Sequence, residues 1–527
     1  MINLKQKYID ACTRKENDSI LDLILKSHLL EKNRDVSEYH EFLLYVLAHP
    51  HNKTIEKKAL KALSLFSLRK NISGHSDLFE KAQNSSGIIN SFTLSTYSLS
   101  LTMALIHQFP NHISLYDIQC PSLTFISILK KINAPLPDKT NSIQEFKNYC
   151  TKNNLEKLTL ITTWFDRSEM SIKTKELLFE KLRIYIVFHH DRKSFSRTLL
   201  RGLAIQSRSI GPEKFIQDYY FNKKSNEVEA KKLRINLSQK ENIQRISAQM
   251  LMMLKRETDP ITHANVHETE WYDMGRGLQI ALFYLKPEFR FKLDAYVGYM
   301  AFRNSIPYAY GGAWVLGSSA AFGLNLFESF RKSEANWTFV QICGLYKNIF
   351  KLKAIRIEPY QIGKDNEDGI QSGAFWFYYK HGFRPKQKKY CDLAYAEFLK
   401  INERKSYRTS YTTLKELANS DLIFSDNKEA KVYLEEDIVK KNQKYFYLNG
   451  NIKTNQVALS IANSQNNLNS LETKFLSKQI SFLLLTLKEP KDEKQKKWIL
   501  NLAMEKSFGD ENKFCLLFRK YIDQYGG

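Results

Sequence analysis

Closely spaced cysteine pairs, which mark many zinc and redox sites, are missing from this chain of 527 residues. None of its cysteines has a second one at C-x-x-C spacing. The six are Cys12, Cys120, Cys150, Cys343, Cys391 and Cys515. Scattered single thiols are typical of a reducing compartment, so we expect a cytoplasmic protein without a metal site.

Long apolar runs are also scarce. Residues 1–11 have the pattern of an amphipathic polar helix and lack the apolar core of a signal peptide. The most apolar window, residues 91–109, is interrupted by Ser, Thr or Tyr at almost every second position. Such a window suits a buried helix better than a membrane span, so we expect no membrane association.

Several common catalytic signatures are absent as well. The sequence contains no Walker lysine loop, no nucleophile elbow and no kinase signature. His263 and His267 are four residues apart, but Pro260 lies just upstream and no third ligand accompanies them, so we expect no metal there. The His-His-Asp run at 189–191 is isolated, and we expect no catalytic residue in the first 220 residues.

Positive charge is what the chain has in excess. Lys and Arg number 79 against 56 Asp and Glu, which gives a net charge of +23. Such an excess favours a polyanionic partner, such as nucleic acid, an acidic protein or a phosphate-rich ligand. The alternative is a lysine-rich surface that is simply solvated, and no recognised nucleic-acid module decides between the two. A hydrophobic content of 43% is ample for packed domains.

The length implies several domains, since one domain usually takes about 100–200 residues. Residues 1–230 are expected to be helical because apolar residues recur at three- and four-residue steps, as in 20–29. Two short apolar runs, 158–164 and 184–188, fit either strands or buried helix segments. The predicted regions are a helical N-terminal region at 1–230, an α/β domain at 231–395 and a helical C-terminal region at 396–527.

The spacing of apolar residues becomes strand-like in the centre of the chain. Strands are expected at 278–285, 295–302, 306–316 and 321–327. Residues 303–305 read as a turn that joins the second and third of these into a hairpin. A helix at Asn336–Phe350, a strand at Ala354–Glu358 and a helix at Gly373–Tyr379 follow. This order predicts an α/β domain with a mixed sheet.

The last of these helices carries a specific pattern, in which Ala374 and Tyr378 precede Gly382-Phe383. With the order of elements, it makes residues 296–385 resemble the C-terminal two-thirds of a GNAT acyltransferase domain. Three further runs are similar to a bacterial family of GNAT-like proteins of unknown activity. They are Tyr272–Gly277, Ala309–Trp314 and Glu358–Glu367. The resemblance implies a multidomain α plus α/β chain, with a central GNAT-like mixed sheet flanked by helical N- and C-terminal regions.

In GNAT enzymes a central strand ends in a splayed gap, and the next helix begins there. Its free backbone N–H groups hold the pyrophosphate of coenzyme A. The resemblance therefore implies acetyl-CoA or another acyl-CoA as ligand. The implied cofactor-binding residues are Arg331, Lys332, Ser333, Ala335 and Asn336. The chain departs from the family at Glu334 and Asn336, which replace glycines and put a carboxylate at a phosphate-binding turn.

The resemblance also implies catalytic roles. In many GNAT enzymes the tyrosine at the position of Tyr378 gives a proton to the departing thiolate, which suits a phenol because its pKa is about 10. The alternative is that Tyr378 is a core aromatic residue. Glu328, at the end of the strand that leads into the turn, is the candidate base, and its alternative is an ordinary ion pair with Arg331.

Two loops complete the set of candidates. The loop before the last helix follows a strand at the edge where open α/β sheets collect ligands. Its polar residues Gln361, Asn366 and Glu367 are the substrate-side candidates. Gly311-Gly312 lies inside a predicted strand, which indicates either a close neighbour, such as a ligand or another backbone, or a β-bulge.

The function implied by the resemblance is transfer of an acyl group from acyl-CoA to an amine or hydroxyl by direct attack. The alternative is a non-catalytic helical scaffold that binds protein or nucleic acid around a degenerate GNAT-like core. Glu334 and Asn336 at the phosphate turn favour this alternative.

Overall fold

A computed structural model describes most of the chain. The described residues are 4–25, 33–65, 86–89, 91–110, 112–137, 140–190, 196–204, 208–211, 219–256, 259–331, 334–404, 406–425, 451–465, 467–487 and 490–525. The chain divides into two compact units. The first consists of residues 1–213, 241–262 and 303–307, and the second of residues 214–240, 263–302 and 308–527.

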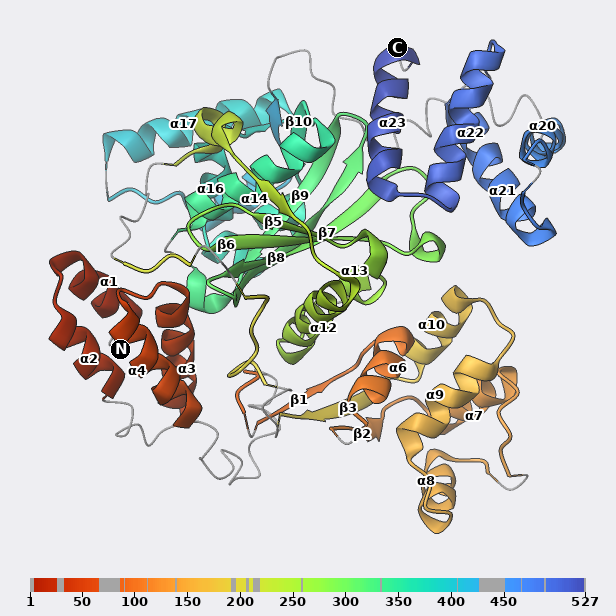
Figure 1. The fold of residues 1–527 in the computed structure, drawn as a ribbon, viewed down its shortest axis with the longest axis horizontal. Coiled ribbons are helices and arrows are strands. Elements are labelled where there is room, and N and C mark those ends of the chain that lie inside the picture. Colours follow the sequence, from red (N-terminus) through yellow and green to blue (C-terminus); the bar gives the residue numbers. More distant parts are fainter. Residues whose placement is uncertain are drawn as a thin grey trace. The chain divides into compact units, whose positions relative to one another are not determined.

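The first unit begins with four helices that pack around an aromatic core (Figure 1). They are α1 (Leu4–Arg14), α2 (Asn17–Leu25), α3 (Asn33–Ala48) and α4 (Lys53–Ser64). Tyr8 is buried, and its ring lies 5.9 Å from that of Phe42 and 6.0 Å from that of Tyr45. Its hydroxyl donates to the carbonyl of His49 at 2.6 Å, so the buried phenol is satisfied.

The remainder of the first unit holds a small antiparallel sheet in the order β1-β3-β2. Its strands are β1 (Phe92–Ser95), β2 (Ile113–Ile118) and β3 (Ile184–His189). Five helices accompany it, namely α6 (Leu99–Gln108), α7 (Ser122–Lys131), α8 (Ile143–Lys152), α9 (Lys157–Arg167) and α10 (Ile172–Lys181). Of the two runs that the sequence left open, 158–164 is therefore helix and 184–188 is strand.

The region at 1–230, which was expected to be helical, thus also contains three strands. The strands β1, β2 and β3 have four to six residues each, which is too short for apolar spacing to separate strand from helix. What makes them strands is pairing between segments far apart in the chain, such as Phe92 with His189.

The second unit is built on a nine-stranded mixed sheet in the order β11-β12-β10-β9-β8-β7-β6-β5-β4. Its strands are β4 (Lys231–Leu233), β5 (Glu270–Asp273), β6 (Leu278–Tyr284), β7 (Ala295–Arg303), β8 (Ile306–Leu316), β9 (Ser319–Leu326), β10 (Ala354–Ile357), β11 (Arg384–Pro385) and β12 (Leu422–Ser425). The β9–β10 pair is parallel, whereas the neighbouring β8–β9 and β10–β12 pairs are antiparallel. The expected strands from 278 to 327 are confirmed as β6 to β9.

The helices of the central region also follow the prediction. α14 (Ala335–Phe350) and α16 (Ala374–Lys380) lie beside each other along the sheet (Figure 1). Phe339 of α14 holds them together, since its ring lies 5.5 Å from that of Tyr378 and 4.6 Å from that of His381. The expected hairpin turn is confirmed, with φ values of 46° at Asn304 and 68° at Ser305, because two-residue hairpin loops favour positive φ.

The second unit also contains the helices α11 (Phe221–Lys224), α15 (Glu367–Gln371), α17 (Lys388–Glu403), α18 (Tyr411–Leu417), α20 (Asn451–Asn463), α21 (Ser470–Thr486), α22 (Glu493–Ser507) and α23 (Glu511–Tyr525). The helix α12 (Leu237–Met253) begins in the second unit, and its residues from 241 onward belong to the first. The region from 396 onward was expected to be helical, yet it supplies β12 to the sheet, between β11 and β10. β12 has only four residues and is a strand because β10 and β11 pair with its two edges.

The glycine pair in β8 is explained by close neighbours rather than by a bulge. A Cβ on Gly312 would collide with the hydroxyl of Tyr296, and one on Gly311 would collide with the backbone carbonyl oxygen of Gly323 and lie 2.9 Å from the hydroxyl of Tyr299. The register from Ala309–Leu326 to Leu316–Ser319 runs through both glycines without a shift. A neighbouring backbone and two tyrosines therefore exclude any other residue at these two positions.

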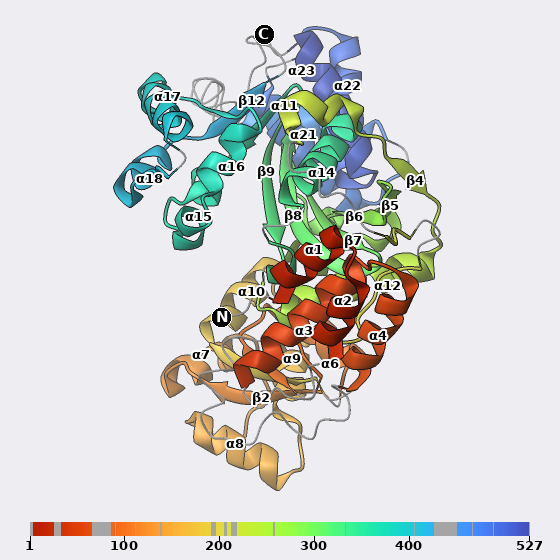
Figure 2. The ribbon, with the colours of Figure 1, turned by 90° about the vertical axis from the view of Figure 1, so that its left-hand side faces the viewer.

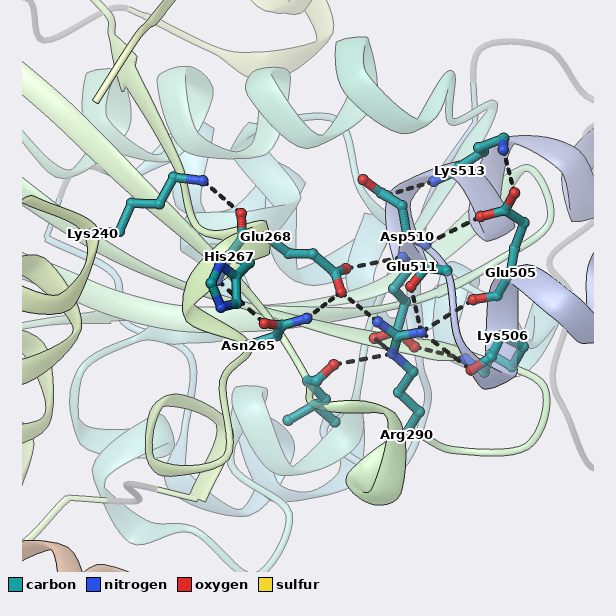
Figure 3. A network of polar contacts seen from close by, with 12 residues as sticks. Lys240, Asn265, His267, Glu268, Arg290, Glu505, Lys506, Asp510, Glu511 and Lys513 are labelled. Carbon is teal, nitrogen blue, oxygen red and sulfur yellow. Dashed lines mark hydrogen bonds and ion pairs between the residues drawn. The ribbon is translucent and has the colours of Figure 1, made fainter. Parts of the chain in front are cut away.

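A buried network of charges attaches α22 and α23 to the sheet (Figure 3). The guanidinium of Arg290 donates to Glu268 at 2.5 Å and lies 3.5 Å from the carboxylate of Glu511. The same group donates to three carbonyls at the end of α22, those of Glu505, Lys506 and Gly509, at 3.1, 3.2 and 2.9 Å. A cation is favourable there because the carbonyl end of a helix carries partial negative charge.

The network is balanced in charge. Lys506 donates to the carboxylate of Glu511 at 2.7 Å and to the carbonyl of Asp294 at 2.9 Å. The backbone N–H of Glu511 donates to Glu268 at 3.0 Å. Two cations thus face two carboxylates. Burial raises the pKa of Glu268, and Arg290 opposes that rise. Removing one partner would leave a buried charge without compensation.

We expect Arg290→Met to lower the free energy of unfolding by about 3–5 kcal/mol, because Glu268 and Glu511 lose their shared cation inside the protein. Urea unfolding followed by the fluorescence of the six tryptophans, of which Trp498 lies on α22, measures this. Lys496→Met is the matched control, since its ion pair with Glu493 is exposed and is expected to contribute no more than about 1 kcal/mol. Equal effects of the two substitutions would contradict the proposed role of the network.

Candidate functional site

The parallel pairing of β9 with β10 ends before β9 does. The last paired residues are Ala321 and Arg356, whereas β9 continues to Leu326. β10 ends at Ile357, and Pro359, which has no backbone N–H to continue the ladder, begins the next turn. Residues 319–322 are buried, whereas residues 323–326 are partly exposed. We call residues 323–326 the β9 edge.

The side-chain amide of Gln361 lies directly on the β9 edge. A Cβ added to Gly323 would be 3.4 Å from the amide nitrogen of Gln361, so the missing side chain is what admits the amide. Gln361 is half-buried, and its amide makes no hydrogen bond with any other residue that the structure describes. Its donor and acceptor are therefore available to a ligand at this edge.

Tyr378, the candidate proton donor, lies on α16. Its ring is buried against Phe339 and Phe383, with ring centroids 5.5 and 5.9 Å away. Its hydroxyl makes no hydrogen bond within the described part of the chain. Burial, followed by the nearby thiol of Cys343, raises the pKa of the Tyr378 phenol, so the group is protonated at neutral pH.

Tyr299 of β7 links Tyr378 to the β9 edge. Its hydroxyl donates to the carbonyl of Gly323 at 3.2 Å. Burial raises the pKa of Tyr299, and Tyr346 and Tyr378 are neighbours close enough to add to the rise. Gln361 and Tyr299 therefore place polar groups at Gly323, and Tyr378 is a neighbour of Tyr299.

The start of α14 already holds an anion of its own. Glu334 occupies the N-cap position, where it is 1% exposed. Its carboxylate lies 3.6 Å from the guanidinium of Arg276, which in turn lies over the ring of Trp337 at 5.1 Å. A carboxylate is favourable at this end of a helix, because the first N–H groups carry partial positive charge. The same carboxylate repels a phosphate group.

Asn336, the second residue of α14, is bonded to a buried histidine. The Nε2 atom of His381 lies 3.2 Å from the Oδ1 atom of Asn336, and the backbone N–H of Phe221 donates to Nδ1 at 3.0 Å. Nδ1 is thus an acceptor, which assigns the proton to Nε2. Burial lowers the pKa of His381 to about 3, so the ring is neutral.

The other residues expected to bind the cofactor lie around the same turn. Ala335 is the first residue of α14. Arg331 is exposed, and its Nε donates to the carbonyl of Leu326 at 3.4 Å. Lys332 and Ser333 lie outside the described residues. Glu328 is exposed in the turn that follows β9 and forms no ion pair within the described part of the chain, so the alternative pairing with Arg331 is not found.

Two substrate-side candidates fix local structure instead. The Oδ1 atom of Asn366 accepts from the N–H of Gly369 at 3.4 Å, and its amide donates to the carbonyl of Tyr360 at 2.9 Å. Glu367 accepts from the hydroxyl of Tyr411 on α18 at 2.9 Å. Of the residues singled out from the sequence, Gln361 lies at the β9 edge, and Tyr378 is a neighbour of Tyr299, whose hydroxyl donates to Gly323.

The sequence reading missed three residues of the site. Arg276 belongs to a run that was noted without a role, and His381 lies between the two halves of the Tyr378 and Gly382-Phe383 pattern. Tyr299 carried no local signal, because its importance depends on the pairing of β7 with strands that follow it in the chain.

Comparisons with family models, curated proteins and solved structures find no match to this chain. Within the described ranges, no three His, Cys, Asp or Glu side chains gather in a way that could hold a metal ion. None of the described helices combines the length and the apolar character that crossing a membrane requires.

We expect His381 to make stability depend on pH. Its pKa in the folded state is about 3, below the ordinary value of about 6.5. The unfolded chain therefore binds the extra proton first, and the stability contributed by His381 is complete above about pH 6.5 and is lost as pH falls toward 3. At pH 5 the loss is about 2 kcal/mol.

Urea unfolding at pH 7 and at pH 5 measures this loss. His381→Gln keeps a neutral polar group at the position, so the difference between the two pH values should shrink by about 2 kcal/mol. His107→Gln replaces an exposed histidine and serves as the control. An unchanged pH dependence in His381→Gln would show that this ring is not the buried neutral group inferred above.

Proposed function

We propose that the β9 edge binds the thioester end of an acyl-CoA and that the protein transfers the acyl group to an amine or hydroxyl acceptor. One observation carries this proposal. The parallel β9–β10 pairing ends at Ala321, and the amide of Gln361, which has no hydrogen-bond partner in the described chain, lies against the next part of β9. The phenol of Tyr378, a neighbour of Tyr299, also has no hydrogen-bond partner among the described residues. Such groups are available to orient a polar ligand.

The thioester end of the ligand fits these residues. Backbone groups at an exposed strand edge can bond to an extended chain that carries amides, as strand addition does in peptide recognition. The pantetheine arm of coenzyme A is such a chain. The amide of Gln361, on Gly323, is suited to hold the acyl carbonyl, and the phenol of Tyr378 supplies a donor from the other side.

The phosphate end does not fit the start of α14 as it fits in GNAT enzymes. Glu334 and its partner Arg276 take the place of a free helix N-terminus, and Asn336 is engaged by His381. Arg331 is the exposed cation next to the end of β9. In this proposal it binds the pyrophosphate by charge, in place of the backbone N–H groups of α14.

The reaction follows from these positions. The acceptor nitrogen or oxygen attacks the thioester carbonyl and loses its proton to the exposed carboxylate of Glu328. The carbon–sulfur bond breaks as the new bond forms. The departing thiolate takes the proton of Tyr378, which burial keeps protonated until that moment. Most of the rate then comes from positioning and from this proton transfer.

A second function is favoured by the start of α14. The Glu334–Arg276 ion pair and the Asn336–His381 hydrogen bond give a closed structure at the helix terminus. A closed helix terminus is what we would expect of a GNAT-like core that binds no ligand. Such a core would belong to a scaffold that binds protein or nucleic acid. The two functions differ in one respect that is easily measured, because the scaffold neither binds acyl-CoA nor releases free coenzyme A from it.

We expect Tyr378→Phe to lower turnover by about 10²–10⁴-fold, the usual contribution of general acid catalysis. Stability should change little, because the hydroxyl has no hydrogen-bond partner to lose among the described residues. Release of free thiol from acetyl-CoA, with a panel of primary amines as acceptors, measures turnover. Tyr284→Phe is the matched control. Its hydroxyl donates to Glu270 at 3.0 Å, and its strand β6 is separated from β9 in the sheet by β8 and β7.

The control should lose about 1–3 kcal/mol of stability and keep full turnover. If Tyr378→Phe retains full turnover as well, the phenol is a core residue and not the proton donor. If the unaltered protein releases no thiol with any acceptor, the scaffold becomes the better account.

A further inference from the structure

A dense run of positive charge lies in a different part of the chain from the β9 edge. It extends from the end of α16 to the first turn of α17. Residues 379–391 contain five basic side chains and no acidic one. The five are Lys380, Arg384, Lys386, Lys388 and Lys389, and all are exposed. Figure 2 shows α15, α16, α17 and α18 gathered in this part of the second unit.

Most of these charges are not neutralised by the protein. Lys389 pairs with Glu416 at 3.0 Å. Within the described chain, Lys380, Arg384, Lys386 and Lys388 form no ion pair. The first turn of α17 also lacks an acidic residue and a side-chain cap. Cations at that end of a helix are locally unfavourable, because the helix N-terminus is itself positive. A bound anion would relieve this repulsion.

Aromatic rings lie among the charges. Tyr395 of α17 is 59% exposed. The guanidinium of Arg384 lies flat over the ring of Tyr379, 3.9 Å from its centroid. Burial raises the pKa of the Tyr379 phenol. Tyr395 lies close enough to Tyr379 to add to that rise. An exposed ring beside a stacked guanidinium gives two flat faces within one charged surface.

We propose that this surface, formed by Lys380, Arg384, Lys386, Lys388 and Tyr395, binds single-stranded nucleic acid. The lysines contact the phosphates of the backbone, and bases stack on Tyr395 and on the guanidinium of Arg384. The net charge of +23 attracts a polyanion over a longer range. A lipid surface fits less well, because one exposed aliphatic side chain on α17, that of Leu399, offers little to insert. The inference does not depend on the proposed acyl transfer.

Fluorescence anisotropy of the full chain with a labelled oligouridylate of about 20 nucleotides tests the proposal. The affinity should fall steeply as salt rises from about 50 to 200 mM. In the triple variant Lys380→Gln, Lys386→Gln, Lys388→Gln, the slope of log affinity against log salt should become shallower by about 2, since each phosphate contact on a single strand contributes about 0.7. Tyr395→Ala should weaken binding by about 5–150-fold, the value of one stacked base.

The matched control removes three exposed lysines from the region around the start of α22, as Lys491→Gln, Lys494→Gln, Lys497→Gln. The control should leave the slope and the affinity nearly unchanged. Equal losses in both triple variants, no effect of Tyr395→Ala, or no binding at about 50 mM salt would each overturn the proposal. Binding to phosphatidylserine vesicles without binding to the oligouridylate would overturn it in favour of a lipid surface.

Discussion

The parallel pairing of β9 with β10 is the constraint on which the rest of the second unit depends. Two parallel neighbours cannot be joined by a hairpin, so the chain must cross over, and α14 is that crossover. The crossover sets Phe339 and Tyr346 against the sheet and places α16 beside them. Because β10 is short and is followed by Pro359, the pairing ends at Ala321 and leaves the β9 edge partly exposed. The candidate site is a consequence of this one mismatch in strand length.

Buried charge in this protein serves structure more than chemistry. Arg290 and Lys506 balance two carboxylates where α22 and α23 meet the sheet, and Glu334 supplies the anion for the start of α14. The amide of Gln361 and the phenol of Tyr378, which have no hydrogen-bond partners among the described residues, are neutral. Neutral groups of this kind are suited to orient a thioester and to supply one proton, while Glu328 and Arg331 are the exposed charges that the proposed reaction uses.

The sequence predicted the long elements of the second unit well and the short ones poorly. In the strands from β6 to β9 and in the helices α14 and α16, apolar residues recur at a clear spacing. Each of these elements has enough residues for that spacing to be recognised. The strands β4, β5, β11 and β12 have two to four residues, and apart from the β5–β6 pair their pairing partners lie far away in the chain. No local pattern can reveal such strands, since their stability comes from the neighbours that they pair with.

The same limit applies to the site. Tyr378 and Gln361 were found because each lies in a pattern that is local in the chain. The contact of Gln361 with Gly323 joins residues 38 positions apart, and the hydrogen bond from Tyr299 to Gly323 spans two strands. The carboxylate of Glu334 was visible in the sequence as a departure from the family, but its pairing with Arg276 was not, because β5 and β6 had first to bring the two segments together.

Calorimetric titration of the full chain with acetyl-CoA tests the central claim most directly. The account predicts saturable binding below millimolar concentration. Gly323→Val, whose side chain would push the amide of Gln361 off the β9 edge, should weaken this binding by about tenfold or more, which corresponds to at least about 1.4 kcal/mol. Gly323→Ala, whose Cβ would be at contact distance from that amide, should largely retain it. Absence of binding at millimolar acetyl-CoA, or equal binding by the valine variant, would contradict the assignment of the β9 edge as the acyl-CoA site.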